Sequence, residues 1–367
     1  MMNLSKELAR RGNDVAVLTT TSGPRFIERR FGFEVRRQPA FLKVLNNPLS
    51  WAVHREWDLV RSSDIVHVHN EHSFLTLNIM AVRRRLKGRV PLTLHGELKF
   101  GTPPLDIFAR KYRATLGRFV LGRADMVFVS SEEERQDLLA RGVQPRKVLL
   151  VHNAVDEDTL ANHLDSNSAQ KIRSRFGIDA ESKIVLFVGR LIPRKGIRTL
   201  LECFRLCLAR RPDLFLVIVG DGPLRGLVDS TIEKWGMRRK VRVEPYLQDI
   251  ALHQVYQGAD VLVLPSIAEG LPTVLLEAMF YGCPTVASDI RGIRDSLGDR
   301  TRLVPVGDAR RFTEEVLASI RDRDRVRRGS IARNTIDVTY TWTKVGEEYE
   351  HTFARLLEDR DYESQRG

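Results

Sequence analysis

The sequence predicts an α/β protein made of two domains, each a parallel sheet covered by helices. Three observations lead to this fold class. The chain has 367 residues, more than one ordinary hydrophobic core accommodates. Short apolar runs typical of buried strands alternate with longer amphipathic segments in both halves. Between residues 153 and 182 a polar, turn-rich stretch interrupts this alternation, which is typical of a domain boundary.

The first half begins unusually for this fold class. A doubly wound domain normally opens with a strand and a glycine-rich turn, whereas the first predicted element here is a helix at residues 3–11. We therefore expect the N-terminal domain, residues 1–155, to lack its first strand and glycine-rich loop. Its other elements are predicted as strands at 14–19, 34–37, 65–68, 90–94, 126–129 and 148–151 and helices at 73–85, 106–121 and 131–140.

The second half alternates more regularly. We expect a linker at residues 156–182, a second domain at 183–342 and a closing helix at 343–367. Strands of the second domain are predicted at 183–188, 214–219, 241–243, 260–264, 283–288 and 302–304, and helices at 197–210, 224–235 and 308–320.

Composition narrows the class of protein. Hydrophobic residues make up 43% and charged residues 29%, as in soluble globular proteins, and no apolar run reaches the roughly 18–20 residues of a membrane-spanning helix. Three cysteines suggest no disulfide framework, and the chain start does not resemble a secretion signal. We expect a cytoplasmic protein, peripheral on the inner face of the membrane if it binds lipid.

The net charge of +12 leaves several partners open. An anionic substrate, an anionic membrane surface and nucleic acid all attract a basic chain, and a solvated basic face needs no partner. Nucleic acid is the least favoured, because no aromatic residues interleave the basic clusters and no nucleic-acid-binding module is recognisable. The clusters are Arg83, Arg84, Arg85, Lys87 and Arg89, followed by Arg110, Lys111, Arg113 and Arg118.

The stretch AEGLPTVLLEAM at residues 268–279 is the strongest candidate for a ligand site. It follows an apolar run and leads into a predicted helix with Pro272 near its first turn. Glu269 precedes the helix and Glu277 lies in its early turns. A helix start offers free N–H groups to an anion, and the two carboxylates accept from hydroxyls on either side. A sugar joined to a nucleotide through pyrophosphate matches that pattern, although an isolated pair of acids is more often solvated.

Two further loops follow strands of the same predicted sheet. The first loop begins at Gly189, where its strand ends. It carries Arg190 and Lys195, which can converge on phosphate oxygens. The second is the turn Gly220-Asp221-Gly222-Pro223, a weak signal by itself. Because ligands of open α/β sheets bind outside the carboxyl ends of strands, the three loops together favour one anion site.

Four histidines in the first half are further candidates for a ligand or metal site. His95-Gly96 closes a predicted strand, where a side chain faces the expected ligand site. His67, His69 and His72 suggest a metal site, but no acid-histidine pattern completes one, so we interpret them as structural.

These segments resemble the retaining glycosyltransferases of the GT-B fold, family 4. The motifs that carry the resemblance are VGRLIPRKG, GDGP, ADVLVLPSIAEGLPTVLLEAM and GCPTVASD in the second half, and DIVHVHN, LTLHG, VSSEEE and HNAVD in the first. The resemblance implies two Rossmann-like domains facing a cleft, with the acceptor in the first, the nucleotide-sugar donor in the second, and a closing helix that returns to the first.

It also implies residue roles. Arg190 and Lys195 hold the donor pyrophosphate, Glu277 accepts from ribose hydroxyls, and Glu269 holds the donor sugar, which His95 contacts from the other domain. The implied catalytic set is Glu269, Arg190, Lys195 and His95, and the implied donor-binding set is Gly189, Arg190, Lys195, Gly222, Gly270, Leu271, Pro272, Thr273 and Glu277. Neither a metal ion nor a cofactor is implied, because two cations and a helix start offset the charge.

The leading hypothesis is therefore a glycosyltransferase that moves a sugar, with retention, to a polysaccharide or lipid-linked acceptor. The alternative is a catalytically impaired relative that binds nucleotide sugars, since the expected first strand and loop of the N-terminal domain are missing.

Overall fold

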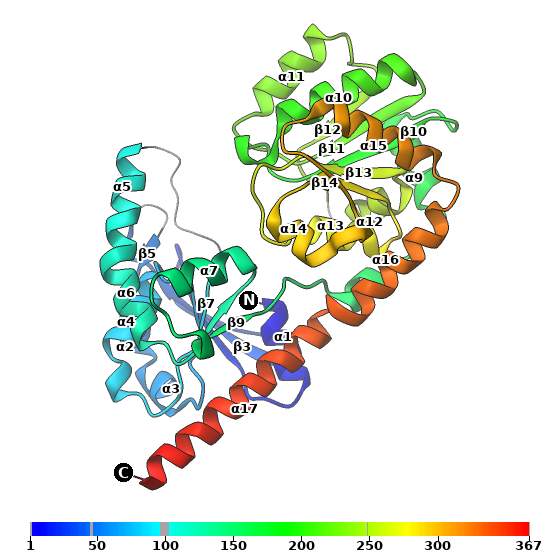
Figure 1. Cartoon of the computed structure of the whole chain (residues 1–367). Helices are drawn as coiled ribbons and strands as arrows, with labels where there is room; N and C mark the ends of the chain where they lie inside the picture. The colour runs from blue at the N-terminus through cyan, green and yellow to red at the C-terminus, as the bar shows by residue number, and fades with distance from the viewer. Residues whose placement is uncertain (1, 45–46, 96–102, 248, 367) are drawn as a thin grey trace. The chain divides into compact units, whose positions relative to one another are not determined.

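A computed structural model of the chain describes residues 2–44, 47–95, 103–247 and 249–366 (Figure 1). The chain forms two compact units. Unit 1 comprises Met1–His152 and Trp342–Gly367, and unit 2 comprises Asn153–Thr341. Both units are α/β with parallel sheets, which confirms the predicted fold class.

Unit 2 contains a six-stranded parallel sheet in the order β12-β11-β10-β13-β14-β15. From β10 the chain adds β11 and β12 on one side, and it then returns to the other side of β10 with β13, β14 and β15. In such sheets ligands bind at this reversal, outside the carboxyl ends of the two neighbouring strands. The strands are β10 (Lys183–Val188), β11 (Leu214–Val219), β12 (Val241–Glu244), β13 (Val261–Leu264), β14 (Thr285–Ser288) and β15 (Arg302–Val304).

Helices cover both faces of this sheet (Figure 1). Every residue of β11 and β13 is buried, which explains why these strands are continuous apolar runs in the sequence. The covering helices are α10 (Ile197–Arg210), α11 (Arg225–Lys234), α12 (Asp249–Gly258), α13 (Thr273–Phe280), α14 (Arg291–Leu297), α15 (Ala309–Arg321) and α16 (Arg325–Thr339).

The expected linker at 156–182 is wrong. This segment forms α8 (Glu157–Asn162) and α9 (Ser168–Phe176), and α9 packs on α12 within unit 2. Ile172 and Phe176, four residues apart on one face of α9, are buried in the core of unit 2. The polar residues that suggested a linker lie on the solvent-exposed faces of these helices. The turn-forming residues lie at the helix ends: Asp156 caps the start of α8, and Gly177 ends α9 with a φ of 63°.

Unit 1 has a mixed sheet, in which β1 runs parallel to β3 and β2 antiparallel to it, and a separate four-stranded parallel sheet. The first has the order β1-β3-β2 and the second the order β6-β7-β8-β9. In the described residues no strand joins β1 to β6, which is where a doubly wound sheet has its first strand. The strands are β1 (Ala16–Thr21), β2 (Phe26–Arg30), β3 (Phe33–Pro39), β6 (Val68–His69), β7 (Leu92–Thr93), β8 (Val127–Val129) and β9 (Val148–Leu150), with a separate hairpin of β4 (Leu42–Val44) and β5 (Asn47–Leu49).

The closing helix α17 (Trp342–Arg366) packs on α1 (Met2–Arg10) in unit 1. Arg11 Nε lies 2.7 Å from a carboxylate oxygen of Glu350, and a Cβ on Gly346 would come within 2.4 Å of the Glu7 side chain. The other helices of unit 1 are α2 (Ala52–Arg55), α3 (Trp57–Ser62), α4 (Phe74–Ala81), α5 (Pro103–Tyr112), α6 (Arg118–Arg123) and α7 (Glu132–Ala140), and η2 (Arg113–Gly117) joins α5 to α6. No helix in the described part of the chain is both long and apolar enough to cross a membrane.

The structure predicts that Phe176→Ala destabilises unit 2 by about 3–5 kcal/mol, because it removes a buried ring and leaves a cavity. Ser174→Ala on the exposed face of the same helix is the control and should change stability by less than about 0.5 kcal/mol. Denaturant unfolding of the full chain measures both. A Phe176→Ala protein as stable as the wild type would indicate that residues 156–182 are a linker after all.

Candidate donor site

The loops that follow β10 and β13 meet at the carboxyl ends of these neighbouring strands. A Cβ on Gly196 would lie 1.8 Å from the Pro265 carbonyl oxygen, and Gly196 has a φ of 66°. Only glycine permits both the backbone conformation and the contact. The backbone N–H of Ile267 donates to the carbonyl of Arg194 at 2.8 Å. These contacts place Lys195 beside the loop that carries Glu269.

We call the region where these two loops meet, around Lys195 and Glu269, the corner. Lys195 and Glu269 form a close ion pair there. Their Nζ and Oε1 atoms are 2.6 Å apart, and the side chains are 13% and 9% exposed. An ammonium group and a carboxylate therefore sit side by side, largely shielded from water. The ammonium can bind a phosphate oxygen and the carboxylate can accept from a hydroxyl, so the pair matches a ligand that carries both groups.

The turn after β11, which contains Gly220 and Gly222, packs against the loop after β10. A Cβ on Gly220 would lie 1.9 Å from the Gly189 carbonyl oxygen, and Leu191 N donates to Asp221 O at 2.9 Å. A Cβ on Gly222 would lie 2.6 Å from the Leu191 carbonyl oxygen, which also leaves no room for a side chain. The structure thus brings together the loops that contain Gly189, Gly222 and Glu269, as the sequence predicts.

Arg190 differs from Lys195. It is exposed and forms no ion pair with any residue that the structure describes. Among the described residues, its guanidinium is therefore not engaged by an acidic side chain, whereas Lys195 is already paired with Glu269.

Helix α13 begins directly after this loop. Its N-cap is Pro272, and no side chain caps the first turn, so the N–H groups near Gly270, Leu271 and Thr273 are not taken by a capping side chain. A free helix start of this kind favours an anion.

Glu277 is held by a residue that the sequence analysis missed. The hydroxyl of Tyr256, a fully buried residue of α12, donates to Glu277 Oε2 at 2.6 Å. Burial raises the pKa of the Glu277 carboxyl, and the hydrogen bond from Tyr256 opposes that rise. The bond fixes one carboxylate oxygen and leaves the other for a ligand. No motif marks Tyr256; only its place on the adjacent helix reveals the role.

His95 lies in unit 1, after β7, and Gly96 lies outside the described residues. The backbone N–H of His95 donates to Asn70 Oδ1 at 3.2 Å, and its Nε2 lies 2.9 Å from His69 Nδ1. Its ring is therefore held from β6. His72 does not join this cluster in any described contact of its side chain.

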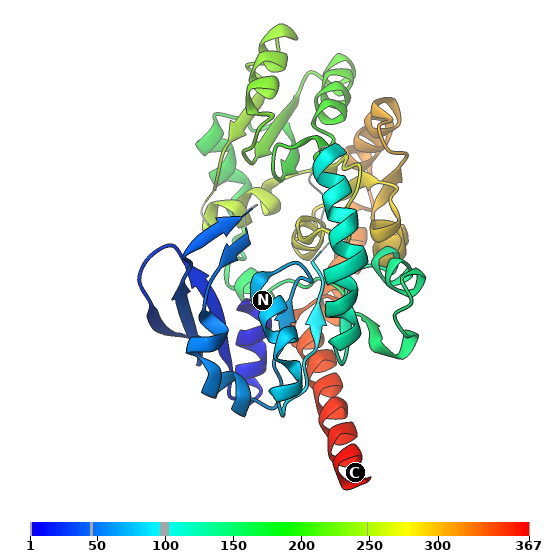
Figure 2. The ribbon, with the colours of Figure 1, turned by 90° about the vertical axis from the view of Figure 1, so that its left-hand side faces the viewer.

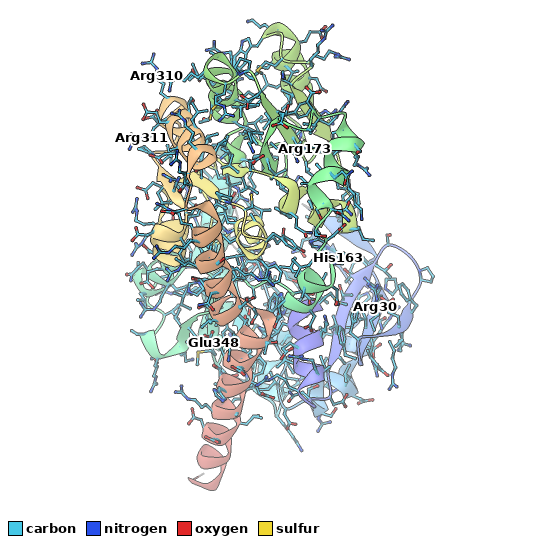
Figure 3. All side chains as sticks on the ribbon, turned by 90° about the vertical axis from the view of Figure 1, so that its right-hand side faces the viewer. Arg30, His163, Arg173, Arg310, Arg311 and Glu348 are labelled. Atoms are coloured by element: carbon cyan, nitrogen blue, oxygen red, sulfur yellow. The ribbon has the colours of Figure 1, made fainter. Side chains whose placement is uncertain are left out.

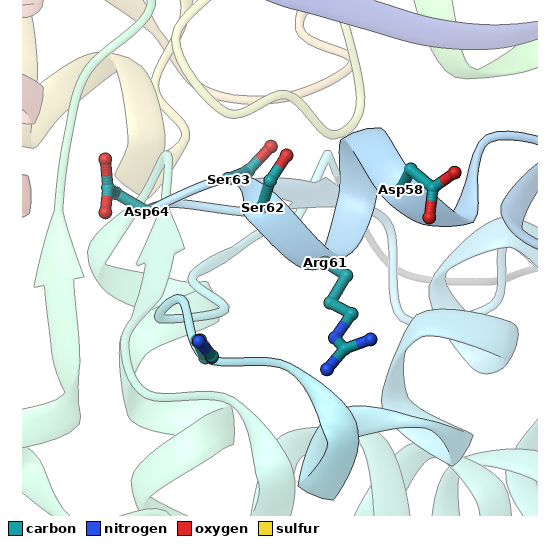
Figure 4. A pocket seen from close by; sticks show the side chains of 6 residues that line it. Asp58, Arg61, Ser62, Ser63 and Asp64 are labelled. Atoms are coloured by element: carbon teal, nitrogen blue, oxygen red, sulfur yellow. The ribbon is translucent and has the colours of Figure 1, made fainter.

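A surface pocket of unit 1 lies elsewhere, at the amino end of β6 (Figure 4). It has mixed charge and is lined by Asp58, Arg61, Ser62, Ser63, Asp64 and Lys87. Ligands of parallel sheets bind at carboxyl ends, so this pocket is not part of the predicted site.

Comparison with known proteins extends these findings. The family "Glycosyltransferase Family 4" matches residues 1–159, and the family "Glycosyl transferases group 1" matches residues 168–335. A 2-deoxystreptamine N-acetyl-D-glucosaminyltransferase from Streptomyces fradiae is 29% identical over 356 residues, covering 89% of this chain and 83% of the relative. A D-inositol 3-phosphate glycosyltransferase from Corynebacterium glutamicum is 28% identical over 57% of this chain and 51% of the relative.

Solved structures share the fold. Sucrose-phosphate synthase from Thermosynechococcus elongatus gives a TM-score of 0.77 at 19% identity, covering 97% of this chain and 92% of the other. HepE from Anabaena, in complex with UDP and glucose, gives 0.75 at 18% identity, covering 96% and 94%.

Two α/β units with parallel sheets, shared with these solved structures over nearly the whole chain, define a protein of the GT-B fold class. The chain belongs to the glycosyltransferases of family 4, with the GT-B fold. It therefore transfers a sugar from a nucleotide-sugar donor.

The buried ion pair can be tested without a substrate. Lys195→Met should destabilise the protein by about 3 kcal/mol, because it leaves the Glu269 carboxylate buried without its cation. Lys195→Met combined with Glu269→Gln should recover most of that loss, since no uncompensated charge remains. Thermal or denaturant unfolding provides the measurement.

Lys171→Met is the matched control. Lys171 pairs with Asp165 at 2.7 Å, but its side chain is 54% exposed, so its removal should cost less than about 1 kcal/mol. Equal effects of Lys171→Met and Lys195→Met would show that the corner does not shield its charges.

Proposed function

We propose that this glycosyltransferase transfers a hexose with retention and without a metal ion, and that the corner between β10 and β13 binds the donor. The observation that carries the proposal is the Lys195–Glu269 pair. In this scheme Lys195 turns to the donor diphosphate while Glu269 accepts hydrogen bonds from the sugar. The donor exchanges partners with the pair, so neither buried charge is left uncompensated.

The departing nucleoside diphosphate gains negative charge as the glycosidic bond breaks. Lys195 supplies one point charge, Arg190 a planar fork, and the uncapped start of α13 a partial positive charge. Preorganised donors of this kind stabilise developing charge more effectively than water does. Because these groups already offset the developing charge, they support transfer without a metal.

Glu277 and His95 complete the proposed donor contacts. The Glu277 oxygen that does not bind Tyr256 accepts from the ribose hydroxyls of the nucleotide. His95 of unit 1 contacts the sugar. The UDP and glucose in the HepE structure, and the UDP-glucose in another structure of HepE, support a nucleotide-sugar donor of this class.

Arg190→Ala gives the cleanest test of this assignment. Removing one charge-stabilising donor typically costs about 100-fold in turnover. Because Arg190 is exposed and unpaired in the described residues, the variant should keep wild-type stability. Transfer or donor hydrolysis is measured with a panel of nucleotide sugars, with Lys195→Ala and Glu269→Ala alongside, and a chelator should leave wild-type turnover unchanged.

Arg194→Ala, an exposed arginine in the same loop, is the control and should retain full turnover. If Arg190→Ala, Lys195→Ala and Glu269→Ala all turned over donor at the wild-type rate, the proposed site would be wrong.

We further propose that the acceptor is a polysaccharide or lipid-linked saccharide, reached at an anionic membrane surface. The segments α5, η2 and α6 form one continuous helical run, drawn in cyan and teal in Figure 2. Its residues Ile107, Phe108 and Leu116 are exposed apolar side chains, and the exposed cations Arg110 and Arg118 lie on the same run. Exposed apolar and basic side chains on one helix favour the interface of an anionic bilayer.

A cationic pocket adjoins this helical run. It has a volume of about 650 Å³ and lies against the end of α7. Five of its lining residues are basic and one is acidic: Arg110, Arg113, Arg118, Arg141 and Lys147, with Asp137. The basic residues of the lining outnumber the acidic one, and this excess of positive charge supports an interaction with lipid phosphates.

The basic charge of the chain does not by itself indicate nucleic acid. Arg310 and Arg311 on α15 point outward from unit 2, and Arg30 lies on unit 1, so exposed cations are spread over the molecule (Figure 3). A nucleic-acid-binding protein concentrates them on one face or groove.

Flotation with vesicles that contain anionic lipid tests the membrane proposal. The wild type should bind at low salt and dissociate as salt rises, because the attraction is screened. Phe108→Ser should weaken binding about tenfold, since burying a phenylalanine side chain is worth about 1.5–3 kcal/mol. Phe31→Ser is the control, because it alters another exposed phenylalanine, 63% exposed against 53% for Phe108, that is far from the helical run in sequence. Absence of wild-type binding at low salt would refute the proposal.

A further inference from the structure

The proposed function gives His95 a contact with the sugar but leaves two neighbouring histidines of unit 1, His67 and His69, without an explanation. His69 is the last residue of β6, and His67 directly precedes this strand. His95 follows the neighbouring strand β7. The two strands are parallel, with His69 opposite Thr93. The ends of the strands therefore bring His69 and His95 to the same edge of the sheet, although 26 residues separate them in the sequence.

His95 is held in two independent ways. Its ring lies nearly parallel to that of His69, with an angle of 11° between the planes and 5.2 Å between centroids, and a 2.9 Å contact joins Nε2 to His69 Nδ1. Its backbone N–H donates to Asn70 Oδ1. Both contacts come from the end of β6, so the backbone and the ring of His95 are oriented by the same two consecutive residues.

The end of β6 is itself rigid. Asn70 has a φ of 63°, a left-handed conformation that asparagine tolerates better than most residues. Its N–H donates to the Thr93 carbonyl at 2.8 Å, and the His69 carbonyl accepts from Thr76 Oγ1 at 3.1 Å. The orienting residues are thus fixed to β7 on one side and to α4 on the other.

The contact between the rings also determines where the protons lie. Burial lowers the pKa of His69 to about 3 and also lowers the pKa of His95, so both rings are neutral at neutral pH. A neutral imidazole has one N–H donor and one bare acceptor. Whichever ring donates across the 2.9 Å contact, the tautomer of His69 dictates the tautomer of His95 and hence the character of its Nδ1.

We propose that His69 and Asn70 are positioning residues, which fix the orientation and the tautomer of the His95 ring for its contact with the donor sugar. The functional part of this inference rests on the proposed role of His95. The structural part, that His69 sets the His95 tautomer, does not depend on that role, because it follows from the contact between two neutral rings.

His69→Phe, His69→Asn and His69→Gln form a graded test. Phenylalanine keeps a ring but loses the hydrogen bond, and should lower kcat about tenfold with little change in the donor KM, as expected for about 1.4 kcal/mol of lost orientation. Asparagine places a polar atom near the position of Nδ1 and should restore part of the rate. Glutamine reaches the position of Nε2 instead and should restore less.

Asn70→Gly is the matched variant for the backbone contact, because it permits the positive φ but removes the Oδ1 acceptor. It should lower kcat several-fold. Thermal unfolding of all variants identifies those that fail to fold.

A double-mutant cycle separates this inference from the proposed role of His95. If His69 acts through His95, then His69→Phe should have no further effect in a His95→Ala background. An unimpaired His95→Ala protein would overturn the proposed role of His95. An impaired His95→Ala together with a fully active His69→Phe would overturn the inference and leave that role intact.

Histidine-selective ¹⁵N NMR tests the structural part without any substrate. The wild type should show a single His95 tautomer and a slowly exchanging imidazole N–H. His69→Phe should give a mixture of tautomers and faster exchange. The same His95 spectrum in both proteins would show that His69 does not set the tautomer.

Discussion

The close approach of two backbones at Gly196 is the constraint on which the donor site depends. Any side chain at this position would collide with the Pro265 carbonyl, 1.8 Å from where its Cβ would stand. Without that contact, the loop after β10 could not place Lys195 against Glu269 from the loop after β13. The reversal of strand order supplies the two neighbouring strand ends, and the glycine lets their loops touch. The chemistry of the site therefore follows from packing.

The Lys195–Glu269 pair also explains how a site for a charged donor remains stable without one. Each group would be costly to bury alone, and each offsets the charge of the other in the corner. The proposed donor carries a diphosphate and hydroxyls, which are complementary to the same two groups, so binding exchanges one set of partners for another. Tyr256 acts similarly on Glu277 by engaging one carboxylate oxygen. Both acids of the AEGLPTVLLEAM segment are thus oriented by contacts within the protein.

Sequence patterns predicted the strands of unit 2 because buried parallel strands are continuous apolar runs, as β10 and β13 illustrate. They also predicted which loops meet, since parallel strands end at one edge. They could not reveal Tyr256 or His69, whose roles depend on which helix or strand packs beside the site. The linker prediction failed because polar residues on the exposed faces of α8 and α9 outnumber the few buried ones, such as Ile172. The edge strand β2 was missed because its side chains are mostly exposed.

Unit 1 depends on contacts between the two ends of the chain. Its two sheets share no strand in the described residues, yet Leu18 of β1 packs against the core that covers β6–β9. Helix α17 packs against β8 from the far end of the sequence: Tyr349 contacts the ring of Phe128, and its hydroxyl lies 3.1 Å from Thr93 Oγ1, which in turn lies 2.7 Å from His67 Nε2. The strands that orient His95 are therefore braced by a helix that follows all of unit 2 in the chain. Because those contacts are long-range, the packing around His67 and β7 depends on residues from both ends of the chain.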